Sequence, residues 1–161
     1  MGHVTKHTLL TELENRLRFE SLLTEISAHF INLPTEQIDG SIQDSLRKIA
    51  EMLDLDRATL GELTADGQDG FATHCYNKAG IPSNMVASVI SDVPLVMKSL
   101  WAGETLIVEN VDDLEPSDRD NFLRYGSKAD LIFPLFVAGT VQGGLAFSSI
   151  EARQWPDTVV G

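Results

Sequence analysis

The sequence predicts an α+β domain in which a central antiparallel sheet has helices on one face and loops with short helices on the other. Two helical segments come first and are followed by strand-like segments at 57–77 and 129–149. The segment 129–138 (ADLIFPLFVA) is apolar on both faces, so both faces of the sheet need a covering layer. A chain of 161 residues is the length of one domain.

The composition argues against several classes of partner. The chain has 24 acidic and 12 basic residues and a net charge of -12, so its field repels nucleic-acid phosphates and anionic membranes. No apolar run is long enough for a membrane span, and the first residues do not resemble a signal peptide. We therefore expect a cytoplasmic protein that does not bind nucleic acid or membrane directly.

The first predicted helix covers residues 8 to about 33 and ends at Pro34. Its main apolar stripe consists of Phe19, Leu23, Ile26, Phe30 and Leu33. A second stripe, Leu10, Leu13 and Leu17, is out of phase with the first. One face is then expected to cover the core and the other to contact a partner, unless the whole segment is one amphipathic helix over the sheet. We assign residues 1–15 to an N-terminal extension, in which a long helix starts, and 16–161 to the main domain.

The next elements are a helix and a hairpin. A second amphipathic helix is predicted up to about Leu53. Residues 57–64 (RATLGELT) are predicted as a strand, 65–70 (ADGQDG) as a turn, and 71–77 (FATHCYN) as the partner strand.

The middle of the chain is predicted to form the layer opposite the first two helices. After a loop that opens at residue 79, a helix is expected over 95–102 with Gly103 as its stop, then a short strand over 104–108. Seven acidic residues between 104 and 120 indicate a solvated loop or, alternatively, a cation site. A short helix over 116–125 ends at Gly126.

The closing hairpin joins strands 129–138 and 140–149 through a tight turn at Ala138-Gly139. Alternation places Val141, Gly143, Leu145 and Phe147 on one side of the second strand and Gln142, Gly144, Ala146 and Ser148 on the other. The small side predicts free volume for a cavity. Gly143, on the large side, would admit a close helix backbone.

Taken together, these elements resemble a GAF domain over residues 16–158. The resemblance is carried by 131–149 (LIFPLFVAGTVQGGLAFSS), by 53–57 (LDLDR), and by Trp155-Pro156, which would begin a last helix. It implies a sheet in the order 2-1-5-4-3, N-terminal helices on one face and a ligand pocket on the other. The first helix is similar to bacterial members placed ahead of histidine kinases or transcription-activating ATPases. Family members continue beyond Gly161, so we expect a domain truncated before its C-terminal helix, with the output domain absent from this chain.

The sequence favours sensing over catalysis. It lacks the usual hydrolase, metalloprotease, phosphate-loop and dinucleotide patterns, so we predict no enzyme, no catalytic residue and no metal site. His74 and Cys75 are neighbours in a strand and should point to opposite faces. Bilin-carrying relatives use a cysteine in another setting, so a chromophore is not expected, and the sequence leaves the cofactor unknown. A minor enzyme would need a reactive Cys75.

We therefore expect a regulatory small-molecule sensor of bacterial signal transduction or transcription regulation. Its terminal helices would transmit the ligand state in a homodimer formed through the N-terminal helix. A ligand-free dimerisation module is the alternative. The residues expected to line the ligand pocket are Tyr76, Met97, Trp101, Tyr125, Ser127, Lys128, Phe133, Ala146 and Ser148.

Overall fold

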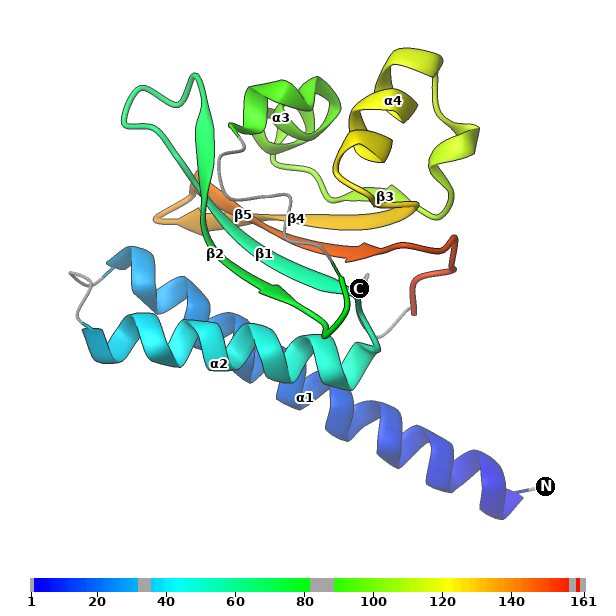
Figure 1. Ribbon diagram of the computed structural model, residues 1–161. Coiled ribbons are helices and arrows are strands. Elements are labelled where there is room, and N and C mark those ends of the chain that lie inside the picture. Colours follow the sequence, from blue (N-terminus) through cyan, green and yellow to red (C-terminus); the bar gives the residue numbers. More distant parts are fainter. Residues whose placement is uncertain (1, 32–35, 82–88, 157–158, 160–161) are drawn as a thin grey trace.

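The computed structural model describes residues 2–31, 36–81, 89–156 and 159, and these form three layers (Figure 1). The lower layer consists of α1 (Gly2–Ile31) and α2 (Glu36–Leu53). The sheet lies above it, and α3 (Pro94–Ala102) and α4 (Pro116–Arg124) cover the opposite face. Both faces of the sheet are covered, as the apolar strand 129–138 required.

The strands in the described part of the chain form one five-stranded sheet in the order β2-β1-β5-β4-β3, with every neighbouring pair antiparallel. They are β1 (Arg57–Leu63), β2 (Gly70–Asn77), β3 (Leu106–Val108), β4 (Ala129–Val137) and β5 (Thr140–Ser149). Two short 3-10 helices, η1 (Ile90–Asp92) and η2 (Val111–Asp113), lie between them in the chain. The predicted α+β class and strand order are confirmed.

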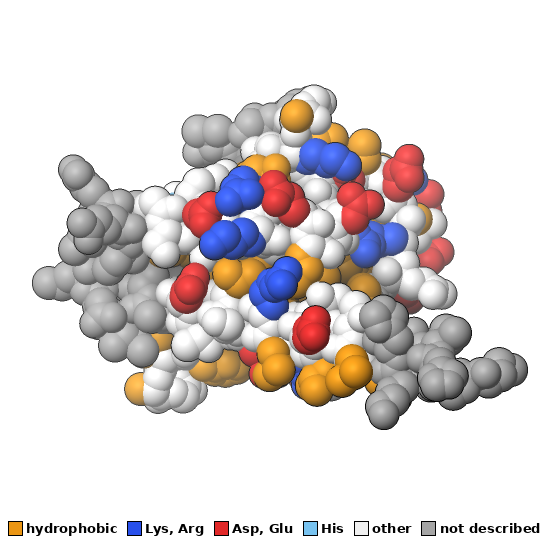
Figure 2. All heavy atoms as spheres, turned by 90° about the horizontal axis from the view of Figure 1, so that it is seen from below, with side chains coloured by type: hydrophobic (Ala, Val, Ile, Leu, Met, Phe, Trp, Pro, Cys, Tyr) orange, Lys and Arg blue, Asp and Glu red, His pale blue; other side chains and the backbone are white. Residues whose placement is uncertain are grey.

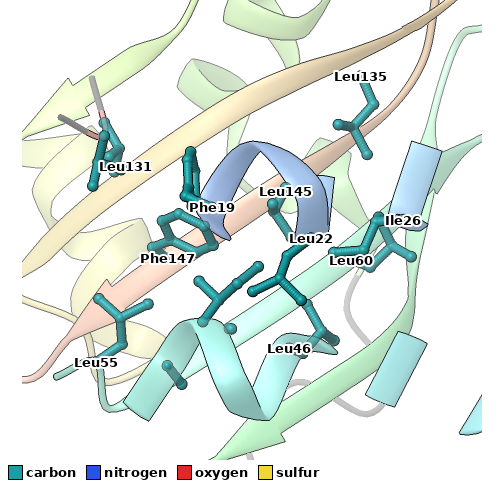
Figure 3. Close-up of a cluster of buried hydrophobic side chains, with 14 of the residues drawn as sticks. Phe19, Leu22, Ile26, Leu46, Leu55, Leu60, Leu131, Leu135, Leu145 and Phe147 are labelled. Atoms are coloured by element: carbon teal, nitrogen blue, oxygen red, sulfur yellow. The ribbon is translucent and has the colours of Figure 1, made fainter. Parts of the chain in front are cut away.

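The main core lies between the sheet and the two long helices (Figure 3). Phe19 of α1 packs on Phe133 and Phe147, with ring centroids 6.0 and 5.8 Å away. Tilted and edge-on aromatic pairs at such distances are favourable beyond their area burial. Other large side chains of this core, labelled in Figure 3, are Leu22, Ile26, Leu46, Leu55, Leu60, Leu131, Leu135 and Leu145.

A smaller apolar cluster joins the upper helices to the sheet. Its buried members are Leu100, Val108, Val111, Phe122 and Ile132. Two helix stops predicted from glycine hold in the structure. Gly103 closes α3 with φ 67, and Gly126, just after α4, has φ 78. Such left-handed conformations are accessible to glycine at little cost.

A β-bulge in the closing hairpin changes one face assignment. Leu135 pairs with Gly143, but Phe136 pairs with Val141, so Gln142 is an extra residue on β5. The alternation therefore shifts by one, and Val141 packs with the upper cluster. The prediction that Val141 shares a face with Leu145 is wrong for this reason. Gly143 lies on the helix side, opposite Leu135, as predicted.

The N-terminal part of α1 extends beyond the sheet (Figure 1). It exposes four leucines, Leu9, Leu10, Leu13 and Leu17, each more than half accessible. The lower face formed by α1 and α2 shows hydrophobic side chains among charged ones (Figure 2). None of the helices in the described ranges has the length and apolar character needed to cross a bilayer.

At the other end, the last helix expected after Trp155-Pro156 falls largely outside the described residues. Trp155 itself is buried, and its Nε1 donates to the Val108 carbonyl at 3.1 Å.

Candidate functional site

A cavity of about 100 Å³ lies between the upper face of the sheet and the layer formed by η1, α3 and the end of α4. Its floor comes from β1, β2, β4 and β5. The described residues that line it are Arg57, Thr59, Gly61, Ala72, Val89, Ile90, Val93, Val96, Leu100, Phe122, Tyr125, Ser127, Asp130, Ile132, Gly144, Ala146 and Ser148.

Strand register arranges the floor in cross-strand rows. Arg57, Ser148 and Asp130 form the first row, because Ser148 pairs with Arg57 on one side and with Asp130 on the other. The next row is Thr59, Ala146 and Ile132, and beyond it Gly61 pairs with Gly144. The floor therefore changes from charged, through small and apolar, to bare backbone.

The paired glycines explain why this strand face has no side chains at its far end. A Cβ on Gly144 would lie 3.0 Å from Leu100 Cδ2, and one on Gly61 would lie 3.3 Å from Ile90 Cδ1. Both distances are shorter than ordinary carbon contacts of about 3.5–4.0 Å. The glycines thus let η1 and α3 approach the sheet, and the remaining volume belongs to the cavity.

The polar end of the cavity is organised around Arg57. Its Nε donates to Asn77 Oδ1 and its Nη1 donates to the Tyr125 carbonyl, both at 2.8 Å. The second bond joins β1 to the residue that follows α4, so the guanidinium fixes the upper layer over the sheet. Hydrogen bonds to a charged donor are among the stronger ones in proteins.

Asp130 faces the same end. Ser148 Oγ donates to its Oδ1 at 2.8 Å. Burial raises the pKa of Asp130 to about 7, and the hydroxyls of Ser127 and Ser148 and the charge of Arg57 oppose this rise only in part. A carboxyl group that changes charge near neutral pH is thus placed in the cavity wall.

Hydrogen bonds tie the cavity's upper wall to the β1–β2 hairpin. Asp69 accepts from the Ser91 backbone N–H at 3.0 Å and from the Ser91 hydroxyl at 2.8 Å. The Ser91 hydroxyl and the backbone donors of Gly70 and Ser91 hold the pKa of Asp69 below its usual value. Trp101 Nε1 donates to the Gly67 carbonyl at 2.7 Å, which links α3 to the same hairpin tip.

Four of the nine residues predicted for the pocket line this cavity, namely Tyr125, Ser127, Ala146 and Ser148. Whether they contact a ligand stays a prediction. The other five do not line it. Met97 is buried within α3, Trp101 is exposed and bound to the hairpin tip, and Lys128 pairs with Asp112 at the surface, 2.7 Å between Nζ and Oδ2.

Tyr76 and Phe133 lie on the wrong face of the sheet, and two bulges account for it. In β2 the extra residue is Thr73, so Tyr76 pairs with Ala58 on the helix side instead of facing the cavity beside Arg57. In β5 the extra residue is Gln142, so Phe133 pairs with Leu145 and packs under the sheet. A one-residue shift exchanges the faces of a strand.

The sequence reasoning missed Arg57, Thr59 and Asp130, which supply much of the polar chemistry of the cavity. A signal was present in each strand. Asp130 is the sole charged residue in the apolar strand ADLIFPLFV, and Arg57 opens a strand that is otherwise mostly apolar. A charged residue that is buried in such a strand generally has a partner or a function.

The other chemistry considered from the sequence is not assembled here. Cys75 pairs with Thr59 and His74 with Leu60, so the two side chains lie on opposite faces, as expected. Within the residues that the structure describes, no three His, Cys, Asp or Glu side chains are grouped to hold a metal ion. The described acidic segment 104–120 contributes ion pairs between Asp112 and Lys128 and between Asp120 and Arg119.

No protein-family model and no curated protein matches the chain. Solved structures do match. The phycocyanobilin-bound GAF domain of a cyanobacterial phytochrome is 16% identical, with a TM-score of 0.66 over 86% of this chain and 84% of that one. The GAF domain of an Acinetobacter phosphoenolpyruvate-protein phosphotransferase is 13% identical, with a TM-score of 0.63 over 91% and 82%.

A third match is a domain assigned to a two-component sensor histidine kinase of Sinorhizobium meliloti 1021, which is 20% identical with a TM-score of 0.58 over 79% and 83%. At these identities the likeness concerns the fold. The strand order, the lower helices and the covered upper face agree with it, and the chain therefore has a GAF-like fold.

Proposed function

We propose that this chain is a regulatory small-molecule-sensing domain of a bacterial signalling or transcription-regulatory protein and acts in the cytoplasm. The observation that carries the proposal is the cavity, which has a charged end and an apolar body. A phytochrome GAF domain of similar fold binds phycocyanobilin, and another neighbour belongs to a sensor kinase. The proposal assigns no catalytic step to the chain.

The volume favours a ligand much smaller than a chromophore. An apolar cavity of roughly 150 Å³ accommodates benzene. The cavity here, about 100 Å³, is smaller than that, so it limits the ligand to a short chain or at most a single ring.

The strands offer a physical route from the cavity to α1. On β4, Asp130 and Ile132 line the cavity, while the alternate residues Leu131 and Phe133 belong to the lower core. The Phe133 ring lies 6.0 Å from the Phe19 ring of α1. A ligand that displaces β4 would thus move a contact with α1, since packed side chains transmit small shifts.

We further infer that α1 pairs with α1 of a second copy. Leu10, Leu13 and Leu17 are each more than half exposed on a helix segment that extends beyond the sheet (Figure 1). Isolated apolar stripes on a helix gain stability by burial against a matching stripe. The same feature supports the alternative function, a dimerisation module that takes no ligand.

A ligand screen against the full chain tests the sensing function. Thermal shift and gentle-desorption mass spectrometry would be run with single-ring compounds, amino acids, small acids and cyclic nucleotides. The control is Ala146→Leu, which adds bulk to the cavity floor. Compounds that stabilise the wild type and not this variant are the expected result. If no compound stabilises the wild type, or if Ala146→Leu responds equally, the sensing proposal fails.

A further inference from the structure

One oxygen of a buried carboxylate in the cavity wall has no hydrogen-bond partner within the part of the chain that the structure describes. Asp130 is 4% exposed, and its Oδ1 accepts from Ser148. Its Oδ2 meets no donor among the described residues. Ser127 also faces this carboxyl, but its hydroxyl donates to the Phe122 carbonyl at 3.4 Å. A buried polar atom without a partner is destabilising, and a bound donor would remove that cost.

The charge of the polar end is balanced without a ligand. Arg57 and Asp130 lie on either side of Ser148 in one cross-strand row. Arg57 is held by Asn77 Oδ1 and by the Tyr125 carbonyl. With Asp130 ionised, the described lining therefore carries one positive and one negative charge. An anionic ligand would meet the carboxylate, and a cationic one would bring a second buried positive charge.

The remainder of the described wall is mostly apolar. Ile90 of η1, Val96 and Leu100 of α3, and Ile132 of β4 surround the volume beyond the polar row. An apolar body placed there loses contact with water without needing hydrogen bonds. The small volume sets the size of that body at about one ring.

We propose that the cavity binds a compact, uncharged molecule whose apolar body lies against α3 and whose N–H or O–H group donates to Oδ2 of Asp130. This inference rests on the proposed sensing function and adds the chemical class of the ligand. It also gives Asp130 a reason to remain buried with one oxygen unpaired.

The affinity for such a donor should depend on pH. Burial raises the pKa of Asp130 to about 7, so the better acceptor, the carboxylate, is depleted at pH 6. Among the described residues, the other charged or titratable groups near this end are Arg57 of β1, Tyr125 after α4 and Cys75 of β2, whose Sγ lies 3.4 Å from Thr59 Oγ1. Asp92 of η1 lies 3.3 Å from the Tyr125 hydroxyl. If the carboxylate form binds, affinity falls about tenfold between pH 8 and pH 6.

Four single-ring probes on the full chain separate the possible ligand classes: phenol, toluene, benzoate and benzylammonium. Calorimetry at pH 8 should give phenol an affinity at least tenfold above toluene, with neither charged probe above toluene. Asp130→Leu and Asp130→Asn, checked for folding by circular dichroism, should reduce the phenol preference at least fivefold. Asp113→Asn, which makes the same change at an exposed carboxylate of η2 outside the cavity, is the matched control and should keep the preference.

The outcomes distinguish this inference from the function on which it rests. Equal binding of phenol and toluene would overturn the donor assignment and leave the sensing function standing. A phenol preference that survives in both Asp130 variants would also overturn the donor assignment alone. The same holds if all four probes fail to bind while the wider screen finds ligands. Failure of the probes and of the wider screen together would overturn both, and would leave a cavity that holds water only.

Discussion

Replacing Asp130 with Asn should make the stability of the protein less dependent on pH. Burial raises the pKa of this carboxyl from 3.8 to about 7. Between these values the folded protein holds a proton that the unfolded chain has released. Stability is therefore lost as the pH rises through this window, and the loss is complete above about pH 7.

The magnitude follows from the two pKa values. At about 1.4 kcal/mol per pKa unit, a rise from 3.8 to about 7 corresponds to a cost of about 4 kcal/mol at pH 8. At pH 5 the same relation leaves a cost of about 2 kcal/mol. Asp130→Asn should therefore raise the free energy of unfolding above that of wild type by about 2–3 kcal/mol more at pH 8 than at pH 5. The amide leaves one N–H unpaired, which lowers the absolute gain at both pH values alike.

Urea unfolding of both proteins at pH 5 and pH 8, followed by circular dichroism, measures this difference. Asp113→Asn, which replaces an exposed carboxylate in η2, is the control and should run parallel to wild type. If the wild type and Asp130→Asn also change in parallel, Asp130 does not titrate in the folded protein as its burial implies, and the reasoning is refuted.

Three further predictions concern the glycine face, the closing turn and the exposed stripe of α1. Gly144→Ala should lower the free energy of unfolding by about 1–3 kcal/mol, because the added Cβ would lie 3.0 Å from Leu100. The control is Gly40→Ala in α2, which should be neutral or stabilising because nothing lies within 4 Å of the added Cβ. Equal losses of stability in the two variants would contradict the packing argument. Ala138→Asn should raise the free energy of unfolding by about 1 kcal/mol. The reason is that φ is 51 at Ala138 and 83 at Gly139, as in a type I′ turn, and Asn adopts positive φ more readily than Ala. Urea unfolding measures the change, and Ala138→Val is expected to destabilise the protein. The double variant Leu13→Lys, Leu17→Lys should shift the protein from dimer toward monomer in analytical ultracentrifugation. Leu123→Lys, which changes an exposed leucine of α4, is the control and should not cause this shift. A monomeric wild type would exclude pairing through α1.

The order of elements could be predicted because local signals mark each boundary. Pro94 and Pro116 begin α3 and α4, Gly103 and Gly126 follow their ends, and the turn at Ala138-Gly139 joins β4 to β5. The small face of β5 was also predictable, since Gly144, Ala146 and Ser148 alternate with large residues. These features depend on short-range sequence alone.

The faces of Tyr76 and Phe133 could not be predicted because they depend on bulges. A hairpin without the extra Gln142 would pair Phe133 with Gly144, on the cavity side, and one without the extra Thr73 would place Tyr76 beside the cavity as well. The strand sequences contain no turn residue that announces either insertion. The place of Asp130 in the cavity wall could not be predicted for the same reason. Asp130 pairs with Ser148, in the row that includes Arg57, only in the register with the extra Gln142.

The most direct measurement is the experimental electron density in the cavity above Ser148 and Ala146, from crystals of the full chain soaked with phenol. The account predicts a ring against Leu100 with its hydroxyl oxygen about 2.7 Å from Asp130 Oδ2. Side chains that fill this volume, or ordered water alone at every phenol concentration tried, would contradict it.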